Sequence, residues 1–149
     1  MKLKVKINKK ILKWILLLSW ILIIFIFSSQ PYSGSVTKSM VKQILPTVKY
    51  TSLIDLINFT IRKLAHLFEY TLLALLTISL LKEYTTKEKI ILISSLVFCF
   101  LYAIIDEFHQ SLVPGRSCLF KDVLIDTAGS LIGIIIYLTI KRISFKKSY

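Results

Sequence analysis

The residues best suited to chemistry form three groups, each at the end of a long apolar stretch. Ionisable side chains in or beside hydrocarbon are costly unless they are paired or hydrated, so they usually have a functional use. The groups combine basic, acidic, imidazole, amide and phenolic side chains. They are Arg62, Lys63, His66, Glu69 and Tyr70, then Asp106, Glu107, His109 and Gln110, and finally Asp122 and Asp126, with Arg116 between the second group and the third.

Histidines and carboxylates in these groups could serve acid–base catalysis or metal binding. The candidates for acid–base work on a lipid-linked substrate are His66, Glu69, Asp106 and His109. The same side chains could hold a divalent cation. However, neither His66-x-x-Glu69 nor Asp106-x-x-His109 has the spacing of an established zinc motif. We therefore assign no metal ligand and leave open both the cofactor and catalysis itself.

The basic residues near these groups suit an anionic ligand. Arg62, Lys63 and Arg116 could hold a phosphate or pyrophosphate head group, the arginines through bidentate contacts. The sequence has no Pro-Ser-Gly-His centre of the lipid phosphatases, no Gly-rich phosphate loop and no nucleophile elbow. Binding without catalysis is therefore an alternative to an enzymatic role.

The elements that must position these residues are four apolar stretches, at about 11–27, 64–81, 90–108 and 123–140. Each approaches the roughly 20 residues that a helix needs to cross a bilayer. Hydrophobic residues make up 55% of the 149 residues, and the mean hydropathy is +0.71. The sequence predicts an all-α membrane bundle of four transmembrane helices, forming a single domain over residues 1–149.

The basic residues predict how this bundle sits in the membrane. Of the 20 lysine and arginine residues, 13 lie before or at the start of the first stretch, separate the second from the third, or follow the fourth. Basic residues favour the cytoplasmic side, so we expect both termini to be cytoplasmic in a multi-pass protein of the cell membrane. The net charge of +12 does not indicate nucleic-acid binding, because no aromatic and basic surface lies outside the stretches.

This topology brings the three groups together at the outer end of the bundle. Arg62, His66, Glu69 and Tyr70 follow i, i+4, i+7, i+8 spacing and share one helix face. Tyr102, Asp106, His109 and Gln110 form a second stripe, and Asp122, Asp126, Gly129 and Gly133 a third. We expect the stripes to open into one pocket rimmed by Arg116, with Glu107 turned towards water or Lys121.

Purely structural roles are open for several of these residues. Asp106 could pair with Arg62, and Glu69 with Lys63, simply to neutralise charge. Asp122 could cap the fourth helix, where the helix dipole favours a carboxylate. Gly129 and Gly133 are typical of closely packed membrane helices.

A short amphipathic helix is predicted after the first stretch. Val36, Met40, Ile44 and Val48 recur near helical spacing, with lysines on the other faces. Such a helix could lie on the outer membrane surface or pack over the bundle.

The same residues resemble motifs of the VanZ family of small bacterial membrane proteins. The matching elements are Phe27-Ser28-Ser29-Gln30-Pro31, Arg62-Lys63-x-x-His66-x-x-Glu69-Tyr70, Asp106-Glu107-x-His109-Gln110-x-x-x-Pro114-Gly115-Arg116, and Asp122-x-x-x-Asp126-Thr127-x-Gly129-x-x-x-Gly133. The founding member of that family is associated with resistance to teicoplanin, a lipoglycopeptide that acts on peptidoglycan precursors outside the cell. The resemblance implies the same association for this chain.

Residues and resemblance together lead to one main hypothesis. The outer pocket engages a membrane lipid or a lipid-linked envelope precursor and lowers sensitivity to lipoglycopeptides. One alternative is an enzyme acting on a polyprenyl-phosphate lipid, with His66 or Glu69 as base. A second is a structural or regulatory membrane subunit, in which the glycines matter more than the polar residues. The sequence also leaves open whether the protein forms a homo-oligomer.

Overall fold

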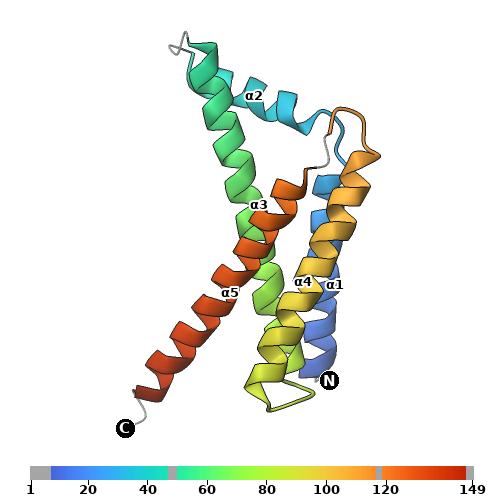
Figure 1. Ribbon diagram of the computed structural model, residues 1–149, viewed down its shortest axis with the longest axis vertical. Helices are drawn as coiled ribbons and strands as arrows, with labels where there is room; N and C mark the ends of the chain where they lie inside the picture. Colours follow the sequence, from blue (N-terminus) through green and yellow to red (C-terminus); the bar gives the residue numbers. More distant parts are fainter. Residues whose placement is uncertain (1–7, 47–49, 117–118, 147–149) are drawn as a thin grey trace, which may run out of the picture.

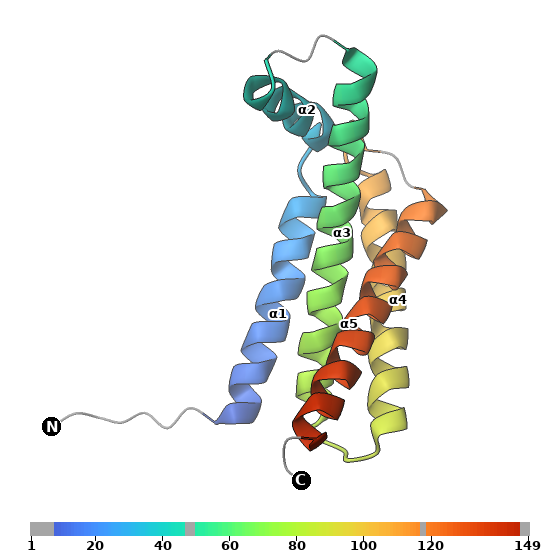
Figure 2. The same cartoon turned by 90° about the vertical axis from the view of Figure 1, so that its left-hand side faces the viewer.

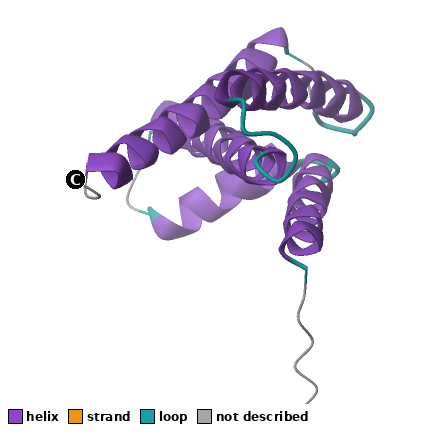
Figure 3. Cartoon of the chain, turned by 90° about the horizontal axis from the view of Figure 1, so that it is seen from below, coloured by secondary structure: helices purple, strands orange, loops and turns teal. Residues whose placement is uncertain are grey.

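The computed structural model describes residues 8–46, 50–116 and 119–146, and this part of the chain is almost entirely helical. Within these ranges there is no strand, which confirms the all-α prediction (Figure 3). The helices are α1 (Lys9–Ser28), α2 (Ser33–Ile44), α3 (Thr51–Leu81), α4 (Glu88–Ser111) and α5 (Phe120–Lys146).

Four of these helices, α1, α3, α4 and α5, are long and apolar enough to cross a membrane, as predicted. Many of their large apolar side chains point outwards. Leu18 is 56% exposed and Ile105 is 61% exposed. Such exposure would be costly in water, but lipid tails are as apolar as these side chains. The outer surface of the bundle therefore fits a lipid environment.

Helix α3 lies at the centre of the bundle and contacts each of the other four helices. The start of α1, the turn between α3 and α4, and the end of α5 lie at one end of the molecule (Figures 1 and 2). Helix α2, the start of α3 and the end of α4 lie at the opposite end. We call this second end the α2 end.

Helix α3 is longer than the apolar stretch that predicted it, because it begins at Thr51 and continues unbroken to Leu81. At 1.5 Å per residue its 31 residues extend about 46 Å, against about 30 Å of hydrocarbon. Helix α2 packs on the additional turns. The Asn58 side chain donates to the Gly34 carbonyl at 3.1 Å, and Lys38 forms an ion pair with Asp55.

Helix α2 has the amphipathic character expected of it. Val41 is buried against the protein, whereas Val36, Met40 and Ile44 are exposed. The predicted fourth member of that stripe, Val48, lies outside the described residues. An apolar stripe turned away from the bundle is available to lipid, and the location of α2 on the outer membrane surface stays a prediction.

Helices α3 and α5 approach each other closely at two glycines. A Cβ atom added to Gly129 would lie 2.5 Å from the Leu67 carbonyl oxygen, and one added to Gly133 would lie 2.6 Å from that of Thr71. The Thr71 hydroxyl also donates to the Gly129 carbonyl at 2.8 Å. Small residues let membrane helices meet backbone to backbone, and here they fix how α5 sits on α3.

The end of the bundle opposite α2 carries the basic residues that predict a cytoplasmic location. Lys13 forms an ion pair with Glu83, and Lys141 pairs with Glu88 at 2.6 Å. These pairs join α1 to the turn after α3, and α5 to the start of α4. The orientation of the bundle in the membrane stays a prediction from charge.

Candidate functional site

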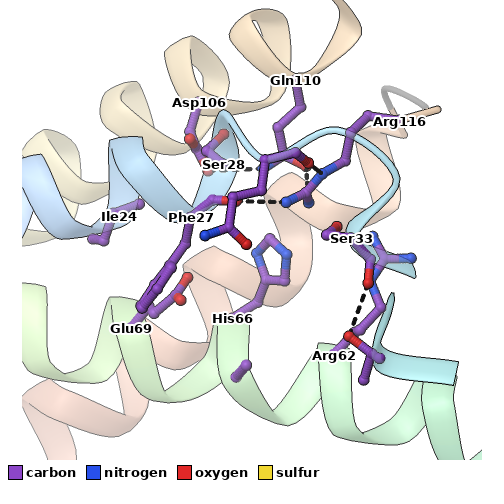
Figure 4. A pocket seen from close by; sticks show the side chains of 13 residues that line it. Ile24, Phe27, Ser28, Ser33, Arg62, His66, Glu69, Asp106, Gln110 and Arg116 are labelled. Atoms are coloured by element: carbon purple, nitrogen blue, oxygen red, sulfur yellow. Dashed lines mark hydrogen bonds between the residues drawn. The ribbon is translucent and has the colours of Figure 1, made fainter. Parts of the chain in front are cut away.

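A polar cavity of about 220 Å³ lies at the α2 end, between α1, α3, α4 and the start of α2 (Figure 4). Its walls combine residues that are far apart in the sequence. It is lined by Ile24, Phe27 and Ser28 of α1, Gln30 of the following link, Ser33 and Thr37 of α2, Arg62, Ala65, His66 and Glu69 of α3, Asp106 and Gln110 of α4, and Arg116 beyond α4.

His66 stands between the cavity and a buried carboxylate on α5. Its Nδ1 atom lies 3.1 Å from Oδ1 of Asp126. Asp126 is completely buried, and its other oxygen, Oδ2, has no hydrogen-bond partner in the described part of the chain. A carboxylate on one ring nitrogen fixes the orientation of an imidazole, so His66 is held with its ring at the cavity wall.

Asp106, Gln110 and Arg116 form a hydrogen-bonded chain along another wall. The side-chain Nε2 of Gln110 donates to Oδ2 of Asp106 at 3.0 Å, and Arg116 donates to the side-chain Oε1 of Gln110 at 3.0 Å. Arg116 also donates to the backbone oxygens of Phe27 at 2.7 Å and Gln30 at 3.4 Å. Burial lowers the pKa of Arg116 from its ordinary value, although an arginine stays charged at neutral pH. Arg116 therefore joins the end of α4 to the end of α1.

Arg62 lies on the cavity wall beside the first turn of α2. A Cβ atom on Gly34 would lie 2.9 Å from Nη1 of Arg62, so the guanidinium packs against that helix. Within the described ranges, the Arg62 side chain makes no hydrogen bond and no ion pair. Of the two arginines at the cavity, Arg62 is thus the one with free donors for an anion.

Glu69 also faces the cavity with a free carboxylate. No hydrogen bond or ion pair to this carboxylate is formed by the residues that the structure describes. Its backbone carbonyl instead accepts a hydrogen bond from the Trp20 indole at 2.9 Å. The alternative in which Lys63 neutralises Glu69 is not found, because Lys63 pairs with Asp122.

Lys63 and Asp122 pair with each other away from the cavity. Lys63 donates to Oδ1 of Asp122, and both side chains are mostly buried. Asp122 lies inside the first turn of α5, which begins at Phe120, so this pair joins α3 to the start of α5. Neither residue lines the cavity, and the alternative pairing of Asp106 with Arg62 is also absent from the described ion pairs.

Two residues of the predicted α4 stripe point to other parts of the molecule. The His109 ring lies 3.0 Å from the Ser29 hydroxyl, and its centroid lies 4.6 Å from that of the Phe25 ring at a tilt of 34°, so His109 contacts α1. Glu107, which was expected to face water or Lys121, is only 1% exposed. One of its carboxylate oxygens accepts the backbone N–H of Leu119 at 3.0 Å, so Glu107 holds the link into α5.

Tyr70 belongs to the hydrophobic core and does not line the cavity. It is completely buried among residues such as Leu73 and Cys99, and its hydroxyl has no partner among the described residues. Of the twelve ligand-binding candidates, those on the cavity wall are Arg62, His66, Glu69, Asp106, Gln110 and Arg116.

Sequence reasoning gave no role to the side of the cavity formed by α1 and α2. Ser28, Gln30, Ser33 and Thr37 all line it, and the Ser28 hydroxyl is buried with no partner within the described ranges. The available signal was the Phe27–Pro31 motif, which carries the family resemblance but contains no ionisable group. Without a charge, nothing in the pattern alone marks these residues as part of a site.

Long lipid-facing helices around a polar cavity define a multi-pass α-helical membrane protein. The chain belongs to the VanZ/LLP1 family, whose model matches residues 13–142 and so covers most of the chain. This match confirms the resemblance and includes every residue of the cavity. Searches of curated proteins and of solved structures each gave no match.

Proposed function

We propose that the cavity binds the anionic head group of a lipid-linked cell-envelope component at the outer face of the cell membrane. The observation that carries this proposal is the unpaired Arg62 guanidinium on the wall of a polar cavity inside a lipid-facing bundle. A phosphate or pyrophosphate group is the natural partner of such a guanidinium.

The cavity fits an amphipathic ligand. Its volume of about 220 Å³ can hold a phosphate or pyrophosphate group with some water. Phe27 lines the cavity and is 50% exposed, so the polar interior adjoins the lipid-facing surface. A lipid could therefore place its head group near Arg62 while its chain stays in the bilayer.

Lower sensitivity to lipoglycopeptides would follow from this binding. Such antibiotics act on peptidoglycan precursors outside the cell, and the founding member of the family is associated with teicoplanin resistance. The charge bias predicts that the α2 end, and so the cavity, faces outwards. A protein that engages lipid-linked precursors there would compete with the antibiotic or alter its target.

The variant Arg62→Ala tests the lipid proposal, with Lys42→Ala as the matched control. Lys42 is an exposed cation on α2 that does not line the cavity. Purified variants in nanodiscs would be titrated with a polyprenyl phosphate, and cells with equal expression would be tested for teicoplanin susceptibility. We expect Arg62→Ala to lose at least about tenfold in lipid affinity, as for loss of a charged hydrogen bond, and to lose protection. Unchanged binding by Arg62→Ala would contradict the proposal.

An enzyme acting on a polyprenyl-phosphate lipid is the second candidate. The observation that favours it is His66, oriented by the buried Asp126 and close to the free carboxylate of Glu69 on the same helix face. This arrangement suits a general base. It predicts turnover of a defined lipid by the purified protein, lost in His66→Ala. Absence of turnover with retained lipid binding would leave binding as the function.

A further inference from the structure

We infer that His66, Asp106 and Asp126 form a site for one divalent metal ion of the Mn²⁺ or Zn²⁺ type. The three side chains come from α3, α4 and α5, and none of the helices supplies more than one. Figure 4 shows the His66 ring and the Asp106 carboxylate on walls of the same cavity. This inference does not depend on the proposed lipid ligand.

The spacing of the donor atoms suits a single ion. One potential ligand atom from each of the three residues lies within 4.8 Å of the other two. Ligands held about 2.0–2.2 Å from one metal ion lie about 3–4 Å apart. The separation of 3.1 Å between His66 Nδ1 and Asp126 Oδ1 already falls in that range. Modest side-chain rotation would bring in Asp106.

The buried carboxylate of Asp126 gives independent support for a ligand. It is completely buried, and its Oδ2 atom has no partner in the described part of the chain. A buried acceptor without a partner is costly, and a buried charge without a partner costs more. A cation bound next to Asp126 would remove that cost.

The charge balance around His66 points to the same conclusion. Asp106, Asp126 and Glu69 are gathered near this one imidazole, and no lysine or arginine forms an ion pair with any of them within the described ranges. The lysine that could have done so, Lys63, pairs with Asp122. A divalent cation among them would compensate these carboxylates directly.

The surroundings also hold the ligands as a metal site requires. Gln110 donates to one oxygen of Asp106, and Arg116 in turn holds Gln110. Such outer hydrogen bonds orient metal ligands. His66 and Asp106 line the cavity, so an ion between them would keep positions open for water or for an anionic head group. One imidazole with two carboxylates suits Mn²⁺ and Zn²⁺ better than soft Cu⁺.

The sequence did not reveal this set because its members are 40 and 20 residues apart, from His66 to Asp106 and from Asp106 to Asp126. The pairs weighed there included His109, which the structure turns towards Ser29, the residue that follows α1. Asp126 takes its place because the close contact at Gly129 fixes α5 against α3.

The test is metal binding by the untagged, full-length protein in detergent. After treatment with a chelator, the protein would be dialysed against Mn²⁺, Zn²⁺ or Mg²⁺, and bound metal would be measured by elemental analysis. The electron paramagnetic resonance spectrum of Mn²⁺ would report the ligands. We expect one Mn²⁺ or Zn²⁺ per chain and a higher thermal unfolding midpoint with the ion.

The variants Asp106→Asn and Asp126→Asn preserve side-chain shape and should lower metal affinity by at least about tenfold. Asp55→Asn is the matched control, since Asp55 pairs with Lys38 far from the cluster, and it should bind as the unmodified protein does. Circular dichroism and gel filtration would show that each variant is folded. If Asp126→Asn fails to fold, the metal affinity of Asp106→Asn by itself tests the proposed site.

Two outcomes would overturn the site: no stoichiometric Mn²⁺ or Zn²⁺ on the unmodified protein, or equal binding by the folded variants. The lipid proposal fails separately, because it is tested at Arg62, which is outside the metal set. Arg62→Ala should therefore still bind the metal ion.

Discussion

At the scale of single residues, the two arginines that line the cavity, Arg62 and Arg116, differ in their hydrogen bonding. Arg116 uses its guanidinium to hold Gln110 and two backbone carbonyls, whereas the Arg62 guanidinium makes no hydrogen bond among the described residues. Planar guanidinium groups make several directed hydrogen bonds at once, and an ammonium group cannot reproduce that geometry. We therefore infer that Arg116 holds the cavity wall in place and that Arg62 binds the ligand.

The change Arg116→Lys should lower stability because it removes most of these bonds. Charged hydrogen bonds contribute about 1.5–3 kcal/mol each, so we expect a clear fall in the thermal unfolding midpoint in detergent. Arg142→Lys is the control, because Arg142 is exposed near the C-terminal end of α5, far from the cavity. An unchanged midpoint for Arg116→Lys would show that these contacts do not stabilise the fold.

Two tyrosines, the buried Tyr70 and the partly buried Tyr102, allow a paired test of hydrogen bonding in the core. The Tyr70 hydroxyl is without a partner in the described structure, whereas the Tyr102 hydroxyl donates to the Ile21 carbonyl at 3.1 Å. Tyr70→Phe removes an unsatisfied group, so its unfolding midpoint should equal or exceed that of the unmodified protein. Tyr102→Phe loses a bond and should unfold at a lower temperature. The reverse order would show that Tyr70 has a partner, such as a bound water.

At the scale of elements, the contact between α3 and α5 decides which side chains meet. Gly129 lies one turn beyond Asp126, and the α5 backbone there touches the α3 backbone at Leu67, next to His66. The separation of the two helix axes thus sets the distance between the imidazole and the carboxylate. A helix pair held apart by larger side chains would separate these two groups.

We expect Gly129→Ala to destabilise the protein by about 1–3 kcal/mol, because the new methyl group meets the rigid Leu67 carbonyl. It should also weaken metal binding by moving Asp126 away from His66. Gly34→Ala is the matched control, since its methyl group meets only the flexible end of Arg62. Thermal unfolding and metal titration of both variants measure the difference. Equal effects of the two substitutions would contradict this role for Gly129.

At the scale of the whole molecule, the main question is which way the bundle faces. The α2 end carries the cavity, and the opposite end carries the ion pairs of Lys13 and Lys141. The four long helices are apolar on their outer surfaces in either orientation. Orientation therefore depends on the charges that flank the helices, and not on the packing within the bundle.

Single cysteines at Leu112 and Thr86 would determine this orientation, in a chain with Cys99 and Cys118 replaced by serine. Leu112 is 69% exposed at the α2 end, and Thr86 is in the turn between α3 and α4. A membrane-impermeant thiol reagent added to intact cells should label position 112 and not position 86. Labelling at position 86 alone would place the cavity in the cytoplasm. That result would exclude the proposed effect on lipoglycopeptides but not the metal site.

Much of this architecture could be predicted from the sequence. Hydrophobic length alone is enough to identify four membrane helices, because every backbone polar group in lipid must be bonded within its own segment. Helical spacing correctly placed Arg62, His66 and Glu69 on one face of α3, and all three line the cavity. Local periodicity is a property of one helix, so it needs no knowledge of the other helices.

Only the tertiary structure decided which partner each polar residue meets. Lys63 contacts Asp122 and not Glu69, His109 contacts Ser29, and Glu107 is buried against Leu119. These pairings depend on helix rotation, helix separation and the course of the links, which arise from contacts between distant segments. Spacing along the chain specifies the face of a helix but not the neighbour across it. For that reason the sequence determined the class and the candidate residues, whereas the fold determined that His66, Asp106 and Asp126 meet.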